Sequence, residues 1–382
     1  MKTNIKKLRN IICLIIAPLL FNSINIKAES SDENPGKTAK KIKIALLLDT
    51  SNSMDGLIEQ AKSQLWTLVN ELAQAKCDNL KPEVKIALYE YGNDRLSAAE
   101  GYIRMVTPLT NDLDKLSEDL FKLTTNGGSE FCGQVIQTAV KQLDWSVDGG
   151  DLQIVFIAGN EPFNQGNVSY INACNQAKSK NIIVNTIFCG DFNEGVNTFW
   201  KRGADITGGS YMSIDQNTKT VFIDSPYDDK IAELNQKLNE TYVEYGREGQ
   251  IKKQKQSVQD KNAESYGKAN TVKRAVSKST HIYKNESWDL VDAAESGSVK
   301  PAAVPKSELP EEMKNMNDAE MEKYLKQKKA ERAKIQQEIL TLNQKREAYV
   351  AQKQKEKAQE KTLDNAMLKA IKSQASKKQF VF

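Results

Sequence analysis

Residues 46–54 read LLLDTSNSM, so an apolar run ends at Asp49 and two serines follow within the next four positions. The whole run IKIALLLD (42–49) is nearly all apolar, which is typical of a strand covered on both faces in a parallel sheet. Apolar residues then recur at steps of three and four from Leu57 to Ala75, the pattern of an amphipathic helix. The stretch therefore predicts a buried strand, a polar loop and a helix, with Asp49 at the carboxyl end of the strand.

The same alternation of apolar runs and helical patterns continues for about 170 residues. Further strands are predicted at 84–92, 103–109, 152–159 and 182–190, with helices between them that include 112–123 and a segment ending at Val140. Strands that alternate with helices indicate an open α/β sheet. In such sheets ligands bind beyond the carboxyl ends of the strands, where the chain turns into the helices.

The loop after the first strand carries side chains that suit a metal ion. Asp49, Ser51 and Ser53 present a carboxylate and two hydroxyls from one turn. These hard oxygen donors favour Mg²⁺, Mn²⁺ or Ca²⁺ and leave room for waters or for a carboxylate from a partner. The alternative is local and structural, with Ser51 capping the helix and Asp49 accepting hydrogen bonds from backbone amides.

Three motifs in a fixed order give the chain a family resemblance. DTSNS (49–53), NGGS (126–129) and IAGNEP (157–162) follow one another as in a von Willebrand factor A (VWA) domain, which the chain resembles from about residue 40 to 222. The resemblance implies a doubly wound, mostly parallel, Rossmann-like sheet with helices on both faces. It also implies a metal-ion-dependent adhesion site (MIDAS) that holds Mg²⁺, or alternatively Mn²⁺ or Ca²⁺, through Asp49, Ser51, Ser53 and Ser129, the last replacing the threonine of the family.

The third motif departs from the family pattern. Where the family usually shows Thr-Asp-Gly, this chain reads Ala-Gly-Asn at 158–160, so the expected carboxylate is absent at Gly159. Asn160 or Glu161 could supply an oxygen instead, and Asp191 at the end of the next predicted strand could line the same rim. A missing carboxylate predicts weaker affinity for divalent cations. The competing interpretation is a degenerate site in a domain that binds its partner without metal.

The N-terminus has the composition of a secretory signal peptide. A basic segment (MKTNIKKLRN) precedes an apolar one (IICLIIAPLLF), and a small residue follows at Ala28. We predict cleavage after Ala28, a disordered lead-in at 29–40 and export to the periplasm or the cell surface, with no integral membrane segment left. A retained anchor is the alternative, but the apolar segment is shorter than the roughly 20 residues of a spanning helix.

Charge and cysteines depend on this cleavage. Residues 1–28 carry five of the basic residues and no acid, so the net charge of +4 becomes −1 in the mature chain. A nearly neutral chain gives no electrostatic reason to expect nucleic-acid binding. Export also permits disulfides among the four remaining cysteines, which allow three pairings, while buried free thiols are the alternative. These cysteines are Cys77, Cys132, Cys174 and Cys189.

The chain after the predicted α/β domain (41–222) is helical and highly charged. A helical extension is predicted at 226–295, a linker rich in Ser and Pro at 296–310, and a long charged helix over 311–382 that begins with a cap at Asn317. Its apolar residues keep a partial seven-residue register, interrupted by Lys328, Arg332 and Arg346, so we expect only a partial coiled coil that packs antiparallel on the helix after Pro226.

A second resemblance covers most of the mature chain. Four segments resemble the sequences of exported bacterial VWA proteins with a helical C-terminal region. They are YEYGND (89–94), TTNGGSEFCG (124–133), AGNEPF (158–163) and STHIYKNESWDLV (279–291). This resemblance implies an architecture but no defined biochemical role.

The sequence shows no catalytic motif. It contains no G-x-S-x-G, H-E-x-x-H or Walker loop, and its single histidine, His281, lies outside the α/β region. We therefore expect no enzyme but a module that binds a protein partner through a MIDAS-like site completed by a partner Asp or Glu. The alternative is a structural or assembly factor of the cell envelope that binds through its helical tail. A third hypothesis, a hydrolase or redox protein using Cys132 or Cys189, requires a reactive thiol.

Overall fold

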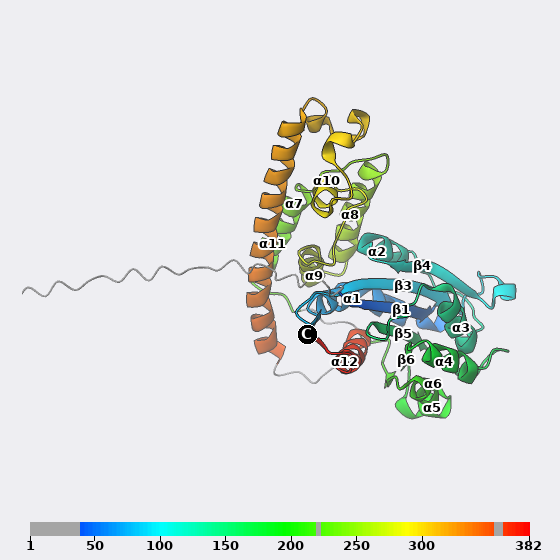
Figure 1. Cartoon of the computed structure of the whole chain (residues 1–382). Coiled ribbons are helices and arrows are strands. Elements are labelled where there is room, and N and C mark those ends of the chain that lie inside the picture. The colour runs from blue at the N-terminus through cyan, green and yellow to red at the C-terminus, as the bar shows by residue number, and fades with distance from the viewer. Residues whose placement is uncertain (1–38, 219–222, 355–361) are drawn as a thin grey trace, which may run out of the picture. The chain divides into compact units, whose positions relative to one another are not determined.

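A six-stranded sheet forms the centre of the computed structural model, which describes residues 39–218, 223–354 and 362–382 (Figure 1). The strands run in the order β4-β3-β1-β5-β6-β7, and all neighbours are parallel except the antiparallel pair β3 and β4. Their bounds are Lys41–Asp49 (β1), Glu83–Tyr91 (β3), Ile103–Thr110 (β4), Leu152–Gly159 (β5), Ile183–Phe188 (β6) and Tyr211–Ser213 (β7). The predicted signal peptide at 1–28 lies outside the described residues.

Both faces of the sheet are covered, as the apolar runs predict. Ile44 and Leu46 of β1 belong to one buried cluster, and Ala45 and Leu47 belong to the other, because successive strand residues point to opposite faces. Helices α1 (Asp55–Leu72) and α2 (Leu113–Phe121) pack in the first cluster, and α3 (Cys132–Gln142), α4 (Tyr170–Ser179) and α6 (Trp200–Thr207) in the second. The short helix α5 spans Phe192–Asn197. The prediction of a doubly wound, mostly parallel sheet is confirmed.

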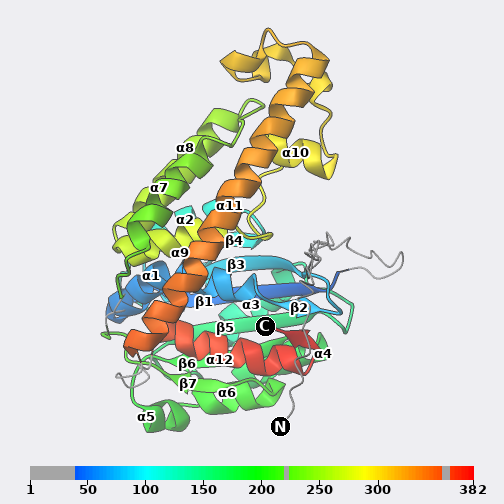
Figure 2. The same ribbon diagram turned by 90° about the vertical axis from the view of Figure 1, so that its left-hand side faces the viewer.

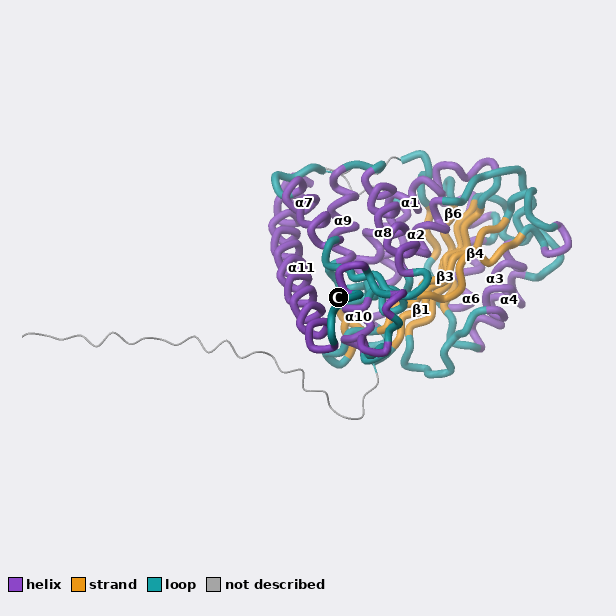
Figure 3. The backbone as a smooth tube through the Cα atoms, turned by 90° about the horizontal axis from the view of Figure 1, so that it is seen from above, coloured by secondary structure: helices purple, strands orange, loops and turns teal. Residues whose placement is uncertain are grey.

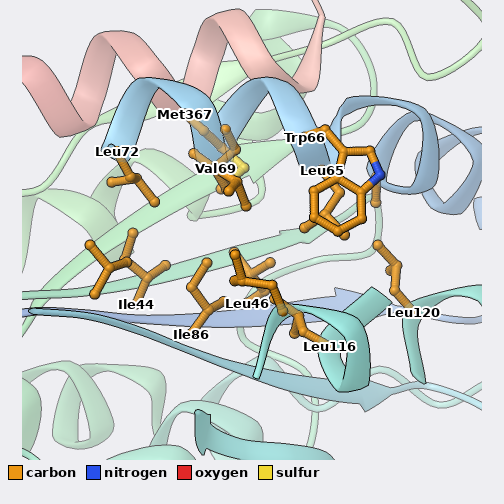
Figure 4. Close-up of a cluster of buried hydrophobic side chains, with 14 of the residues drawn as sticks. Ile44, Leu46, Leu65, Trp66, Val69, Leu72, Ile86, Leu116, Leu120 and Met367 are labelled. Atoms are coloured by element: carbon orange, nitrogen blue, oxygen red, sulfur yellow. The ribbon is translucent and has the colours of Figure 1, made fainter. Parts of the chain in front are cut away.

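The C-terminal helix α12 (Leu363–Ser376) completes the first of these faces, beside α1 (Figure 2). Met367 lies among the apolar side chains of α1 and β1 (Figure 4), and Ile371 is buried in the same cluster. The side-chain oxygens of Gln60 and Gln64 accept hydrogen bonds from the first backbone amides of α12. After the helix, β8 (Phe380–Val381) pairs with the short strand β2 (Lys76–Cys77). Residues far apart in the sequence therefore share one core.

The remaining helices form a second layer against α1 and α2. They are α7 (Asp228–Asn239), α8 (Gly249–Glu264), α9 (Lys268–Lys278), α10 (Leu290–Ser296) and α11 (Asp318–Gln354), and Figure 3 shows α11 beside α7. Arg346 Nε lies 2.9 Å from Asp228 Oδ1, and Arg332 Nε lies 3.1 Å from Thr241 Oγ1, so the two helices run antiparallel. This confirms the predicted antiparallel packing for α11 only, because the segment predicted as one helix over 311–382 also contains the separate helix α12, which packs on α1 and the sheet.

The arginines that interrupt the apolar register of α11 are buried rather than solvated. Arg332 contacts Asp289 and Asp292, and Arg346 contacts Asp228. The predicted cap at the start of α11 is present, because the backbone amides of Asn317 and Glu320 each donate to the other residue's side chain. Short 3-10 turns lie at Asn52–Met54, Ala98–Glu100, Pro301–Ala303, Lys306–Glu308 and Glu311–Met313.

Two further observations concern the cysteines and the apolar character of the helices. The four cysteines of the described residues are buried free thiols, which is the second of the two states left open by the sequence. None of the helices in the described ranges combines the length and the apolar character that crossing a membrane requires.

Candidate metal-binding site

The DTSNS loop lies at the carboxyl end of β1, where the sequence places it. Asp49 is the last residue of the strand, and its Oδ1 accepts a hydrogen bond of 2.7 Å from the backbone amide of Ser51. The hydroxyl oxygens of Ser51 and Ser53 are 3.3 Å apart. Ser51 stands at the cap position of the 3-10 turn but makes no capping hydrogen bond with its side chain. Asp49 thus does bind a backbone amide, while the hydroxyls of Ser51 and Ser53 contact each other beside it.

Backbone hydrogen bonds attach the second loop, NGGS (126–129), to the first. The amide of Asn52 donates to the carbonyl of Gly127 at 3.0 Å, and the amide of Asn126 donates to the carbonyl of Thr50 at 3.0 Å. Ser129 follows directly and is half-buried. The second loop therefore lies against the loop that carries Ser51 and Ser53.

The third loop follows β5 and reaches the same edge through Asn160. The amide nitrogen of Asn160 lies 3.2 Å from the hydroxyl of Ser53, so these two predicted site residues are in contact. Oε2 of Glu161 accepts a hydrogen bond of 3.0 Å from Gln165. Asp191 caps α5, where Oδ1 accepts from the amides of Asn193 and Glu194. The carboxylate of Asp191 is therefore engaged in holding its own helix.

The structure gives a reason why the third loop has glycine where the family has aspartate. A Cβ atom placed on Gly159 would lie 2.5 Å from the hydroxyl of Tyr91 and 3.0 Å from Oδ2 of Asp49. Real Cβ atoms essentially never come as close as the first distance, and the second is tighter than most real contacts. The Tyr91 hydroxyl is itself fixed, because it donates a hydrogen bond of 2.9 Å to the carbonyl of Ala158. Tyr91 thus occupies the space that an aspartate at position 159 would need.

The structure adds one acidic residue that the sequence interpretation missed. Glu130, directly after the NGGS loop, is only 5% exposed and belongs to the same edge of the sheet. A Cβ atom on Gly92 would lie 2.7 Å from Cγ of Glu130 and 2.8 Å from Oδ1 of Asp49, so the two acidic side chains face each other across this glycine. The one sign of Glu130 in the sequence is its position directly after the predicted ligand loop, but the family pattern assigns no role to this residue.

Burial and the neighbouring acidic groups disfavour the charged forms of Asp49 and Glu130. Burial raises the pKa of Asp49 to about 7, against hydrogen bonds from Ser51 that lower it. Burial, followed by the charges of Asp49 and Glu161, raises the pKa of Glu130 to about 8. Oδ2 of Asp49 is buried with no hydrogen-bond partner. Among the described residues, no lysine or arginine forms an ion pair with Asp49 or Glu130.

These observations fit a divalent cation held largely by side-chain hydroxyls. The described part of the chain contains no group of three or more His, Cys, Asp or Glu side chains placed to hold a metal ion. A site here depends on a carboxylate together with the hydroxyls of Ser51, Ser53 and Ser129, which are the hard oxygen donors that Mg²⁺, Mn²⁺ and Ca²⁺ prefer. The unpartnered oxygen of Asp49 is the strongest single indication.

The cysteines near this edge do not have the properties of nucleophiles. Burial raises the pKa of Cys132 and of Cys189 well above the ordinary value of a thiol, and Asp49 raises both further. A reactive cysteine needs a lowered pKa and a cationic neighbour. His281 does not compensate, because burial lowers its pKa to about 4 and it lies outside the α/β sheet.

The sheet order and the three loops at one edge define a domain class, and comparison with known families agrees. Residues 43–221 match the family described as "von Willebrand factor type A domain". The chain is therefore a VWA domain protein with an additional helical C-terminal region. VWA domains are in general non-catalytic binding modules that often carry a MIDAS metal site.

Solved structures similar to the chain include BatB from Bacteroides thetaiotaomicron, at 17% identity and a TM-score of 0.35, covering 46% of this chain and 90% of that one. The SpRpn10 VWA domain has 18% identity and a TM-score of 0.36, covering 47% and 91%. Proximal thread matrix protein 1 of the mussel byssus, solved with a zinc-occupied MIDAS motif, has 12% identity and a TM-score of 0.33, covering 46% and 42%. No curated protein matches the chain significantly.

Proposed function

We propose that the protein is an exported binding module that recognises a protein partner through a divalent cation at the carboxyl edge of its sheet. Mg²⁺ is the expected ion, with Mn²⁺ and Ca²⁺ as alternatives, and Asp49, Ser51, Ser53 and Ser129 are the expected ligands. The observation that carries the proposal is the buried Oδ2 of Asp49, which has no hydrogen-bond partner at the place where the loops converge.

The roles of the residues follow from their positions. Asp49 supplies a carboxylate from the end of a central strand, where it pairs with Tyr91 of β3 and the preceding Leu48 pairs with Ala158 of β5. Ser51 and Ser53 supply oxygens from one turn, and contact with Asn160 holds the hydroxyl of Ser53 beside the third loop. A cation bound by these groups would keep coordination positions open for a carboxylate of the partner.

The absence of a carboxylate at Gly159 shapes the expected affinity. Fewer charged ligands weaken divalent binding, so we expect the site to bind in the range of weak extracellular modules, on the order of 10⁻⁴–10⁻³ M. An export route would place the protein where divalent cations reach such concentrations. Export itself rests on residues 1–28 and is tested separately by sequencing the N-terminus of the mature protein, which we expect to begin at Glu29.

Two short peptides that differ only in a carboxylate test the partner chemistry. With Mn²⁺ added to the protein, the relaxation of water protons reports how many waters the ion keeps. We expect acetyl-Gly-Asp-Gly-amide at millimolar concentration to displace a bound water and lower the relaxivity, while acetyl-Gly-Asn-Gly-amide does not. The Asp49→Ala variant serves as control, because it should show no protein-bound Mn²⁺. Equal effects of the two peptides would refute carboxylate recognition.

A further inference from the structure

Glu130 has no role in the family pattern, yet it is the second carboxylate at the edge that carries Asp49. We propose that Glu130 is a ligand of the divalent cation and takes over the part of the carboxylate that is missing at Gly159. This inference rests on the proposed function, since it assigns one more ligand to the same site.

The glycines around Glu130 show how closely it approaches the other ligands. Gly92 has a φ of +78° and separates the side chains of Glu130 and Asp49, each within 2.8 Å of the position that a Cβ would take. A Cβ on Gly128 would lie 2.6 Å from Oε1 of Glu130 and 2.7 Å from Cβ of Ser51. Side chains at either glycine would occupy the space between the acid and its neighbours. The carboxylate of Glu130 therefore lies within a few ångströms of Asp49 and of Ser51.

Glu130 is too deeply buried to serve only as a surface charge that keeps the protein soluble. The residue is 5% exposed, and no lysine or arginine of the described ranges pairs with it. A buried acidic side chain without a cationic partner is costly, and such groups in proteins are usually paired or bound to metal ions. The unpartnered oxygen of Asp49 at the same edge is an independent sign that the site is built for a ligand.

Glu161 is the rival for this role and fits it less well. Its Oε2 already accepts a hydrogen bond from Gln165, and its backbone carbonyl accepts one from the indole of Trp200. These contacts hold Glu161 toward α6 and its own loop. The side chain of Glu130, by contrast, has its hydrogen bond with Ser51, which is itself a predicted ligand.

Three charge-neutralising variants of the full chain separate these possibilities. Mn²⁺ is titrated by calorimetry into the wild-type protein and into Glu130→Gln, Glu161→Gln and Asp94→Asn. Asp94 is the matched control, because it is exposed and close enough to raise the pKa of Glu130 by its charge. If Glu130 binds the ion directly, Glu130→Gln should abolish saturable binding at millimolar Mn²⁺, while Asp94→Asn changes the affinity by only a few-fold.

A vibrational measurement distinguishes ligation from general electrostatics. Infrared difference spectra on addition of Mn²⁺ should contain the shifted carboxylate stretches of two residues in the wild type and of one in Glu130→Gln. Thermal unfolding without metal checks the fold, and we expect Glu130→Gln to be at least as stable as the wild type because burial disfavours the charged form of Glu130 and the neutral amide avoids that cost.

The outcomes also separate this inference from the proposed function. Binding by the wild type that Glu130→Gln leaves unchanged, or that Glu161→Gln abolishes instead, would overturn the assignment of Glu130 and leave the metal site standing. A wild-type protein that binds no Mn²⁺ at millimolar concentration would overturn both.

Discussion

At the scale of single residues, the contact between Tyr91 and Gly159 explains the most unusual feature of the site. The hydroxyl of Tyr91 lies where a side chain at position 159 would begin, and it is held by the carbonyl of Ala158. An aspartate at position 159 must therefore displace the hydroxyl of Tyr91. The glycine at position 159 and the buried tyrosine at the end of β3 therefore depend on each other, because the tyrosine hydroxyl fits only beside a residue without a side chain.

This linkage makes a testable prediction for stability. We expect Gly159→Asp to lower the free energy of unfolding by about 1–3 kcal/mol, because a new side chain must displace a well-packed hydroxyl. In Tyr91→Phe the hydroxyl is gone, so the added cost of Gly159→Asp should be smaller in that background. Urea unfolding of the two single variants and the double variant measures the coupling. Strictly additive effects would contradict the steric explanation.

The sequence predicts the positions of Asp49, Ser51 and Ser53 well, because a polar loop after a buried parallel strand must emerge at the carboxyl edge of the sheet. It does not predict Glu130, since nothing in a single sequence reveals that an acid beside a loop is 5% exposed. The assignment of Asp191 to the rim stays a prediction, to which the structure adds that Oδ1 of this residue caps α5. Side-chain direction, rather than position along the chain, limits the prediction.

At the scale of elements, the packing of α12 is the feature that the sequence could not predict. Leu363, Met367 and Ile371 recur at steps of four, which predicts a helix with one apolar face but does not say which surface it covers. The structure places this face on α1 and the sheet, where Gln374 also exchanges hydrogen bonds with Asn185 of β6. The last helix of the chain thus completes the core of the domain that begins with β1.

Substitution of one residue of α12 tests whether this packing stabilises the whole sheet. Ile371 is fully buried, so Ile371→Ala should cost about 2–5 kcal/mol in the free energy of unfolding, with a single cooperative transition. Lys369→Ala on the exposed side of the same helix is the matched control and should change stability by no more than about 0.5 kcal/mol. Circular dichroism during urea unfolding measures both. A small effect of Ile371→Ala would mean that α12 packs only loosely on the sheet.

At the scale of the whole molecule, buried charges join the helical layer to the sheet domain. The guanidinium of Arg274 in α9 is fully buried, pairs with Asp114 of α2 and Asp260 of α8, and lies 4.4 Å from the ring centroid of Trp66 in α1. Removing one partner of such a network leaves an uncompensated buried charge, which is strongly destabilising. We infer that the helical layer and the sheet domain behave as one unit in the described residues.

Because the C-terminal helices pack on the sheet domain, binding through the helical tail cannot be tested by simply deleting them. Deletion of residues 311–382 would remove α12 together with α11, and so would expose the core of the sheet. Charge reversals on the exposed face of α11, such as Lys326→Glu with Lys334→Glu, leave the core intact and are the better comparison with Asp49→Ala. Any partner that contacts the metal site should respond to Asp49→Ala and not to these reversals.

Calorimetric titration of Mn²⁺ into the purified protein and its Asp49→Ala variant shows whether the carboxyl edge of the sheet holds a divalent cation. We expect saturable binding of one ion by the wild type, with a dissociation constant on the order of 10⁻⁴–10⁻³ M, and loss of that binding in Asp49→Ala. Absence of binding by the wild type at millimolar Mn²⁺, or equal binding by the variant, would contradict it.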